Sequence, residues 1–299
     1  MALTRLPPEQ WYPAGWPGVT ARRVALGDGT SVRVVESGPA DGRPLVLLHG
    51  WAVSAYLWRH NLAALAAAGW RCHVPDLTGH GLSDAPAGKG EYTLDAFAAR
   101  GERLLDALGI GRVPVVAQSM GGRVATALAM RGRAERLVLF GPVGFGDVTP
   151  ARAFAPFIPD IAGEFASAFV TRPMVEGVQR RVHGKLGWFT DRDVDEYWAP
   201  TQFPGVVRAQ LQMLREFAWE PLSETEQRRV DVATLVVFGT ADRTVRPKRA
   251  EALVAGLPRG RIAWIEGGGH VVMEEVPERV NALLVEFLDR KSTRLNSSH

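Results

Sequence analysis

One serine stands where a nucleophile could be exposed. Ser119 lies in the segment 118–122 (QSMGG), directly after the continuous apolar run 113–117. This pattern predicts a buried strand, a sharp turn and a helix. A serine at such a turn adopts a strained backbone that needs small residues two positions before and after it. Ala117 and Gly121 meet that need, although glycine is usual at both positions. Because serine also favours helix N-caps, capping is the alternative role for Ser119.

A histidine and an aspartate follow two later apolar segments. Asp242 follows the predicted strand 234–238 through Gly-Thr-Ala, and His270 follows the predicted strand 261–265 through a glycine run. A serine becomes nucleophilic when a histidine takes its proton and a carboxylate orients that histidine. The carboxyl ends of parallel strands meet at one edge of a sheet, so we expect Ser119, Asp242 and His270 to lie together.

His270 and Asp242 each have a structural role as the alternative: His270 as a loop histidine, and Asp242 as a turn or cap residue. Asp147 is a second candidate for the acid, because it lies beyond the predicted strand that ends at Phe140. We favour Asp242, since Gly141 and Pro142 follow that strand directly. Replacing Asp242 by Asn should therefore abolish turnover, whereas the same change at Asp147 should not.

Two backbone N–H groups are expected to hold a developing oxyanion. Met120 follows the candidate nucleophile and opens the predicted helix, and Trp51 ends the segment His49-Gly50-Trp51 after the predicted strand 45–48. The Trp51 indole would also form a wall of the substrate pocket, with simple packing as the alternative. His49 is interpreted as a brace for this loop rather than as a second base.

Strand-like and helix-like segments alternate along the chain. The strands lack polar alternation, which is typical of a parallel sheet covered by helices on both faces. We predict strands at 32–36, 45–48, 71–74, 113–117, 137–140, 234–238 and 261–265, and helices at 55–68, 94–108, 121–130, 247–255 and 277–288.

The part between residues 143 and 221 has a different character. It is rich in Phe, Trp, Pro and Arg, and stretches such as 161–170 and 206–217 are predicted to be helical. We predict that it is a helical cap inserted into a core formed by residues 1–142 and 222–290. A peripheral domain without a catalytic part is the alternative. Trp188 and Trp198 are chosen as substrate-binding candidates from its apolar side chains, which include Phe154, Phe157, Phe165, Phe169, Phe189, Phe203, Met213 and Phe217.

Composition limits the remaining classes. A single cysteine among 299 residues excludes an intramolecular disulfide and a cysteine-cluster metal site. The formal charge is +3; without Lys291 and Arg294 of the segment 291–299, which reads as an appended non-native tail, it is +1. No basic stripe and no long apolar run are visible, so we expect no nucleic-acid or membrane partner. Residues 1–9 lack the apolar part of a signal peptide, which predicts a cytoplasmic protein.

These motifs together resemble the α/β-hydrolase superfamily, in particular its serine hydrolases with a helical cap. The resemblance rests on His49-Gly50-Trp51 and on the segments 76–83 (DLTGHGLS), 118–122, 239–242 (GTAD) and 269–270 (GH). It implies a cap inserted after the sixth core strand and acyl transfer to water. Ser119 would attack a carbonyl with His270 as base, Asp242 as orienting acid, and no metal or organic cofactor. The segment 76–83 is interpreted as structural.

Within the superfamily, residue types separate several relatives. The loop from His49 resembles haloalkane dehalogenases and epoxide hydrolases, but those use an Asp nucleophile where Ser119 stands here. Hydrolases of carbon–carbon bonds (meta-cleavage products) have a segment similar to 118–122 around the serine. Here, however, Val271 follows the candidate base, and the oxyanion loop reads Trp-Ala-Val-Ser. Cofactor-free perhydrolases and lactonases are further alternatives.

The main prediction is hydrolysis of carboxylic esters with small to medium apolar or aromatic groups, by a monomer or homodimer. A ligand-binding receptor or scaffold on the same fold is the non-enzyme alternative.

Overall fold

An eight-stranded sheet with the order β1-β2-β4-β3-β5-β6-β8-β10 forms the centre of the molecule. The computed structural model describes residues 6–148 and 167–289. The strands from β4 to β10 in that order are parallel, whereas β2 runs antiparallel to both of its neighbours. The sheet strands are β1 (Val19–Ala25), β2 (Ser31–Ser37), β3 (Arg43–Leu48), β4 (Trp70–Pro75), β5 (Val113–Gln118), β6 (Ala134–Phe140), β8 (Ala233–Gly239) and β10 (Gly260–Ile265). The predicted, mostly parallel sheet is confirmed.

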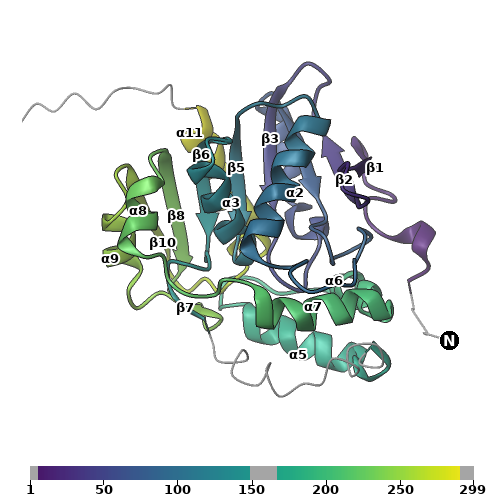
Figure 1. Ribbon diagram of the computed structural model, residues 1–299. Helices are drawn as coiled ribbons and strands as arrows, with labels where there is room; N and C mark the ends of the chain where they lie inside the picture. The colour runs from purple at the N-terminus through teal and green to yellow at the C-terminus, as the bar shows by residue number, and fades with distance from the viewer. Residues whose placement is uncertain (1–5, 149–166, 290–299) are drawn as a thin grey trace, which may run out of the picture.

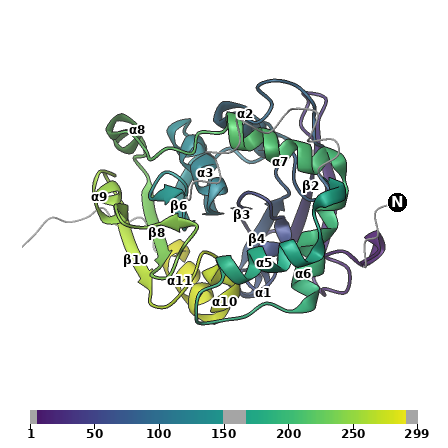
Figure 2. The same ribbon diagram turned by 90° about the horizontal axis from the view of Figure 1, so that it is seen from below.

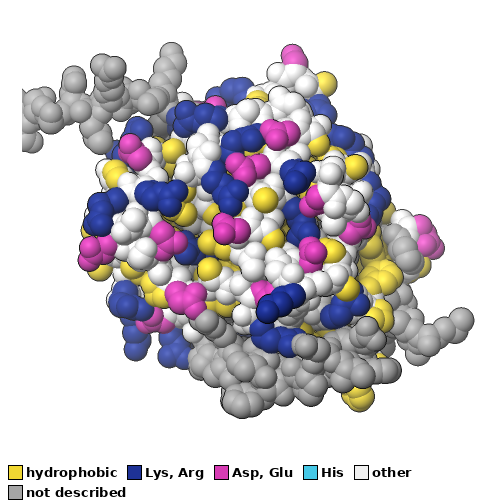
Figure 3. Space-filling model, in the orientation of Figure 1, with side chains coloured by type: hydrophobic (Ala, Val, Ile, Leu, Met, Phe, Trp, Pro, Cys, Tyr) yellow, Lys and Arg dark blue, Asp and Glu magenta, His cyan; other side chains and the backbone are white. Residues whose placement is uncertain are grey.

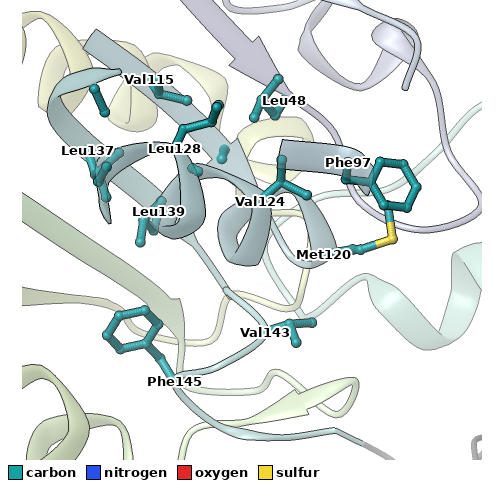
Figure 4. Close-up of a cluster of buried hydrophobic side chains, with 14 of the residues drawn as sticks. Leu48, Phe97, Val115, Met120, Val124, Leu128, Leu137, Leu139, Val143 and Phe145 are labelled. Atoms are coloured by element: carbon teal, nitrogen blue, oxygen red, sulfur yellow. The ribbon is translucent and has the colours of Figure 1, made fainter. Parts of the chain in front are cut away.

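Helices cover both faces of the sheet (Figures 1 and 2). α2 (Leu94–Ala107) and α3 (Met120–Met130) lie on one face, and α1 (Leu62–Ala67) and α11 (Pro277–Asp289) lie on the other. The short helices are α8 (Glu224–Arg229), α9 (Ala250–Ala255) and α10 (Val272–Glu275). Figure 4 shows Val124 and Leu128 of α3 packed over the strand residue Val115, all in one buried cluster. This burial fixes α3, and therefore Ser119 at its start, against the sheet.

Local sequence signals explain where several helices begin. The Thr93 hydroxyl accepts a hydrogen bond from the Ala96 N–H and caps α2. Ser223 and Glu226 form a reciprocal capping box at the start of α8. Such caps satisfy N–H groups that have no partner inside the helix, and each is worth about 1 kcal/mol.

Among the residues that the structure describes, three α-helices that precede α8 in the chain lie below the carboxyl ends of the parallel strands in Figure 1. They are α5 (Arg172–Val182), α6 (Asp191–Trp198) and α7 (Pro204–Glu216), and we refer to them as the inserted helices. α6 begins with a capping box formed by Thr190 and Asp193. The predicted helix at 161–170 falls mainly outside the described residues, which resume with the short 3-10 helix Ser167–Phe169. The aromatic residues Phe154, Phe157 and Phe165 and the tail 291–299 also lie outside them.

The structure differs from the sequence predictions at three places. β1 was not predicted, because it is an edge strand with one buried residue in seven. The helix predicted at 55–68 is instead a 3-10 helix (Ala55–Trp58) followed by α1, since Ser54 and Asp76 take the first N–H groups of a separate turn. Val143 and Phe145 belong to the core cluster, and β7 (Asp147–Val148) pairs with β9 (Val245–Arg246), two short strands that were not predicted. The bounds of the cap stay a prediction.

The surface shows mixed charge. On the face seen in Figure 3, Lys and Arg side chains are interspersed with Asp and Glu rather than gathered in one region. Among the described residues, no helix combines the length and apolar character needed to cross a bilayer.

Candidate active site

Ser119 occupies a strained turn between β5 and α3. Its φ is 52° and its ψ is −119°, a left-handed conformation that a non-glycine residue adopts at a cost of about 1–3 kcal/mol. The turn is held because the Ser119 N–H donates to the Phe140 carbonyl (3.0 Å) and the Ser119 carbonyl accepts from Val143 (3.0 Å). A Cβ at Gly121 would overlap the His49 carbonyl oxygen. The sequence-based requirement for a small residue at this position is therefore confirmed.

The structure places His270 against the carboxylate of Asp242. His270 Nδ1 and Asp242 Oδ2 are 2.7 Å apart, and both side chains are almost fully buried. The other Asp242 oxygen accepts the N–H groups of Thr244 (2.8 Å) and Val245 (3.0 Å), which fixes the plane of the carboxylate. Asp242 follows β8 and His270 follows β10, so neighbouring parallel strands bring the pair together.

Asp147, the other candidate acid, pairs with an arginine rather than with His270. It stands in β7, is about half exposed and pairs with Arg249. Gly141, which follows β6, lies under the His270–Asp242 pair instead: a Cβ there would be 2.9 Å from Asp242 Oδ2 and from His270 Nδ1. A side chain at position 141 would therefore push the pair apart.

Gln118 is a site residue that sequence reasoning missed. It immediately precedes Ser119, and its amide nitrogen donates to the His270 carbonyl at 3.3 Å. A Cβ at Gly50 would overlap the Gln118 amide oxygen and come within 2.9 Å of Ser119 Cβ. Gln118 thus connects the strand that carries the serine with the loop that carries the histidine. Its position between a strand and the serine was the only signal in the sequence.

The two expected oxyanion donors belong to segments that pack against each other. Met120 starts α3, and Trp51 follows the close contact between Gly50 and the Gln118–Ser119 turn. The Trp51 indole N–H donates to the Gln210 carbonyl of α7 at 3.1 Å, so this side chain also ties the loop to the inserted helices. Ala52 adopts a φ of 60°, which turns the chain sharply after Trp51.

His49 braces the loop before Trp51. Its Nδ1 donates to the Gly50 carbonyl (2.7 Å), and its Nε2 accepts the Leu77 N–H (2.9 Å). The ring is fully buried and stacks edge-on against His80, with 5.0 Å between centroids. Burial lowers the pKa of His49, and burial lowers the pKa of His80 to about 3, so both rings are neutral near pH 7.

The segment 76–83 is organised around Asp76. Its carboxylate accepts the Arg33 guanidinium (2.7 Å) and the N–H groups of Ala55 (2.8 Å) and Leu82 (2.9 Å). Burial alone would raise the pKa of Asp76, but Arg33 and these donors outweigh burial and lower it. These contacts agree with the structural interpretation of this segment.

Of the two tryptophans chosen as substrate contacts, Trp188 lies in the segment between α5 and α6, and Trp198 is the last residue of α6. Trp188 is 61% exposed and stacks on Phe189 with 4.8 Å between centroids. Trp198 is partly buried, and its indole N–H donates to the Val170 carbonyl (3.0 Å). A contact of either ring with substrate stays a prediction.

Comparison with known proteins places this geometry in a family. Residues 43–277 match the family described as alpha/beta hydrolase fold, and the chain belongs to it. Curated relatives include the magnesium-chelatase 30 kDa subunit of Rhodobacter capsulatus (30% identical; 93% of this chain and 98% of that protein) and epoxide hydrolase A of Mycobacterium tuberculosis (27%; 91% and 98%). The solved carboxylesterase CesB of Bacillus subtilis has the same fold (TM-score 0.73, 21% identical; 92% and 93%). The homologues indicate a hydrolase.

Proposed function

We propose that the protein hydrolyses carboxylic esters of small to medium apolar or aromatic compounds through an acyl-enzyme on Ser119. The observation that carries this proposal is a serine held at positive φ on the edge of the sheet where a buried His270–Asp242 pair lies. A strained nucleophile and a histidine oriented by a carboxylate are the parts that acyl transfer needs.

In the proposed reaction, Ser119 Oγ attacks the ester carbonyl while His270 Nε2 takes its proton. The Asp242 carboxylate holds the Nδ1–H and stabilises the imidazolium that forms. The N–H groups of Met120 and Trp51 stabilise the oxyanion. His270 then protonates the leaving alcohol, and the acyl group remains on Ser119. Water, deprotonated by His270, attacks this ester and releases the acid, which returns Ser119 and His270 to their starting states.

The residue at position 119 separates the proposed reaction from those of two related enzyme classes. Haloalkane dehalogenases and epoxide hydrolases resemble this chain around the His49 loop, but they use an Asp nucleophile. With Ser119, attack on an alkyl carbon would form an ether that a triad cannot hydrolyse. Attack on a carbonyl carbon forms an ester that it can. The name of the R. capsulatus relative is that of a subunit, so a binding role is the outcome to consider if no turnover is found.

The test is hydrolysis of p-nitrophenyl esters from acetyl to decanoyl by the wild type and by Ser119→Ala. Ser223→Ala is the matched control, because Ser223 caps α8 on an exposed part of the surface. We expect Ser119→Ala to lose activity on every ester and Ser223→Ala to keep it. The best chain length would measure how long an acyl group the site accepts. A folded wild type without turnover, or a Ser119→Ala variant as active as the wild type, would overturn the ester proposal.

A further inference from the structure

The end of α5 is joined to the loop that carries His270 by backbone hydrogen bonds. The His270 N–H donates to the Val182 carbonyl at 2.7 Å, and the Lys185 N–H donates to the Gly267 carbonyl at 2.9 Å. Val182 is the last residue of α5, and Gly267 precedes His270 by three positions. The candidate base is therefore attached directly to the inserted helices.

At this junction there is no room for a side chain at Gly184 or at Gly269. A Cβ at Gly184 would overlap the Gly267 oxygen and the Gly269 nitrogen, and a Cβ at Gly269 would overlap Gly184 in return. The two segments touch along their main chains, so a shift of one must move the other.

Glu275 bridges the two segments. One of its carboxylate oxygens accepts the Gly269 N–H at 2.8 Å, and the other accepts the Gly184 N–H at 2.9 Å. The residue is 6% exposed and ends the short helix α10, which follows His270. Each oxygen thus holds one side of the junction, and one of the two donors, Gly269, is the residue directly before His270.

The neighbouring carboxylate has a different set of partners. Glu274 accepts the Tyr197 hydroxyl (2.6 Å) and pairs with the buried guanidinium of Arg59, which also contacts Asp193 (2.8 Å). These contacts fasten α6 to the core. Two consecutive glutamates therefore fasten two inserted helices, but of the two only Glu275 bonds to Gly269, the residue before His270.

We propose that Glu275 is a positioning residue for the base: its carboxylate joins the His270 loop to the end of α5 and sets the reach of the imidazole toward Ser119. This inference rests on the proposed function, because it assigns to His270 the proton transfer of the ester reaction. Glu275 touches neither substrate nor reacting atoms and acts through the Gly269–His270 backbone.

The electrostatics of Glu275 fit a role in positioning rather than in stability. Burial of its carboxyl outweighs the two N–H donors and the nearby His183, and it raises the pKa of Glu275. A carboxylate with a raised pKa is one whose charge costs folding free energy at neutral pH. Removing that charge while keeping the shape should therefore recover part of the free energy that is lost when one N–H donor faces an NH₂ group, which keeps the net change in stability small.

The test is Glu275→Gln, compared with Glu278→Gln as a control. Glutamine keeps the shape but has one amide oxygen, so one of the two N–H donors would face an NH₂ group. Glu278 is exposed and lies three residues further along the chain. Ester turnover is measured per active site, titrated with a fluorophosphonate. We expect kcat of Glu275→Gln to fall about tenfold or more, with KM within about twofold and Tm within a few degrees, because small displacements of a catalytic group are costly.

A kcat equal to that of the wild type in folded Glu275→Gln would overturn the positioning role, and so would a loss that only follows a lowered Tm. If Glu275→Gln does not fold, Glu275→Asp replaces it: the charge remains, but the shorter side chain cannot reach both segments, and unchanged kcat there would overturn the inference. A wild type that neither turns over esters nor reacts with the fluorophosphonate would overturn the proposed function itself, and the inference with it.

Discussion

Two buried histidines follow parallel strands of the same sheet, and their rings are held in different ways. Both nitrogens of His49, after β3, are bonded to backbone groups of Gly50 and Leu77. Only Nδ1 of His270, after β10, is held by a carboxylate, that of Asp242. Structural hydrogen bonds occupy both nitrogens of the His49 ring, whereas Nε2 of His270 is the nitrogen that can take a proton. This difference supports the proposal that His270 is the base and His49 a brace, because a base needs one ring nitrogen that structural hydrogen bonds do not take up.

The strongest way to break this comparison is to remove the charge from the partner of His270. We expect Asp242→Asn to lower kcat by about 10⁴-fold, because the imidazole loses its orienting carboxylate and takes the wrong tautomer. Asp147→Asn is the matched control and should stay near wild type, since Asp147 pairs with Arg249 at the surface. Ester kinetics on both variants decide the matter; the reverse result would move the acid to Asp147.

Exchanging the two histidines for glutamine should produce opposite profiles. His49→Gln should lower the free energy of unfolding by about 2 kcal/mol, because it disturbs two buried hydrogen bonds, while kcat per titrated site stays within about tenfold. His270→Gln should abolish turnover and change stability less. Urea unfolding and ester kinetics measure both. A catalytic loss at His49 as large as that at His270 would contradict the assignment of His49 as a brace.

The neutral histidines also predict how stability depends on pH. The folded-state pKa values of His49 and His80 lie below the ordinary 6.5, so the unfolded chain binds protons that the folded chain does not. Stability should therefore fall as the pH drops below about 6.5, by up to about 1.4 kcal/mol per pH unit for each histidine, until the folded-state pKa is reached. For His80 that value is about 3. Urea unfolding from pH 7 to 4 should show that the free energy of unfolding falls less steeply with falling pH in His80→Asn than in the wild type, by the contribution of one proton. Equal slopes in the two proteins would show that His80 does not contribute to this pH dependence.

The smallest effect is expected at Trp188, whose exposed ring lies in the segment between α5 and α6. We propose that Trp188 gives an outer contact to aromatic esters, and Trp188→Ala should then raise their KM about two- to threefold. An outer contact that leaves much of this 61% exposed ring in water removes little apolar surface from water, so the effect on KM is small. Acetyl and benzoyl esters compared side by side provide the measurement. Equal KM values in the variant and the wild type for both esters would remove Trp188 from the substrate contacts.

The sequence was informative where a residue follows a buried strand and uninformative where it acts through backbone atoms. Ser119, Asp242 and His270 could be placed because each comes after an apolar run, and parallel strands align their carboxyl ends. β1 could not, because only one of its seven residues is buried and it has no such run. Gln118 and Glu275 bond to main-chain groups of His270, Gly269 and Gly184, and such partners leave no pattern of residue types.

The inserted helices were predicted as a helical region but not in their contacts. Amphipathic spacing identifies α7, whereas the neighbours of Trp188 and Trp198 depend on how separate helices pack. The pairing of β7 with β9 was not predicted either, because each of these strands has only two residues. The division into a core and a cap remains a proposal, and the Glu275 variants test one of its junctions.

The most direct test of the central claim is to detect the acyl-enzyme. The wild type is mixed with p-nitrophenyl butyrate, quenched in acid during turnover and examined by mass spectrometry, intact and after digestion. The account predicts one added butyryl group on the peptide that contains Ser119, and no such adduct in Ser119→Ala. A butyryl group on another residue, or rapid hydrolysis with no adduct on Ser119 at any quench time, would contradict it.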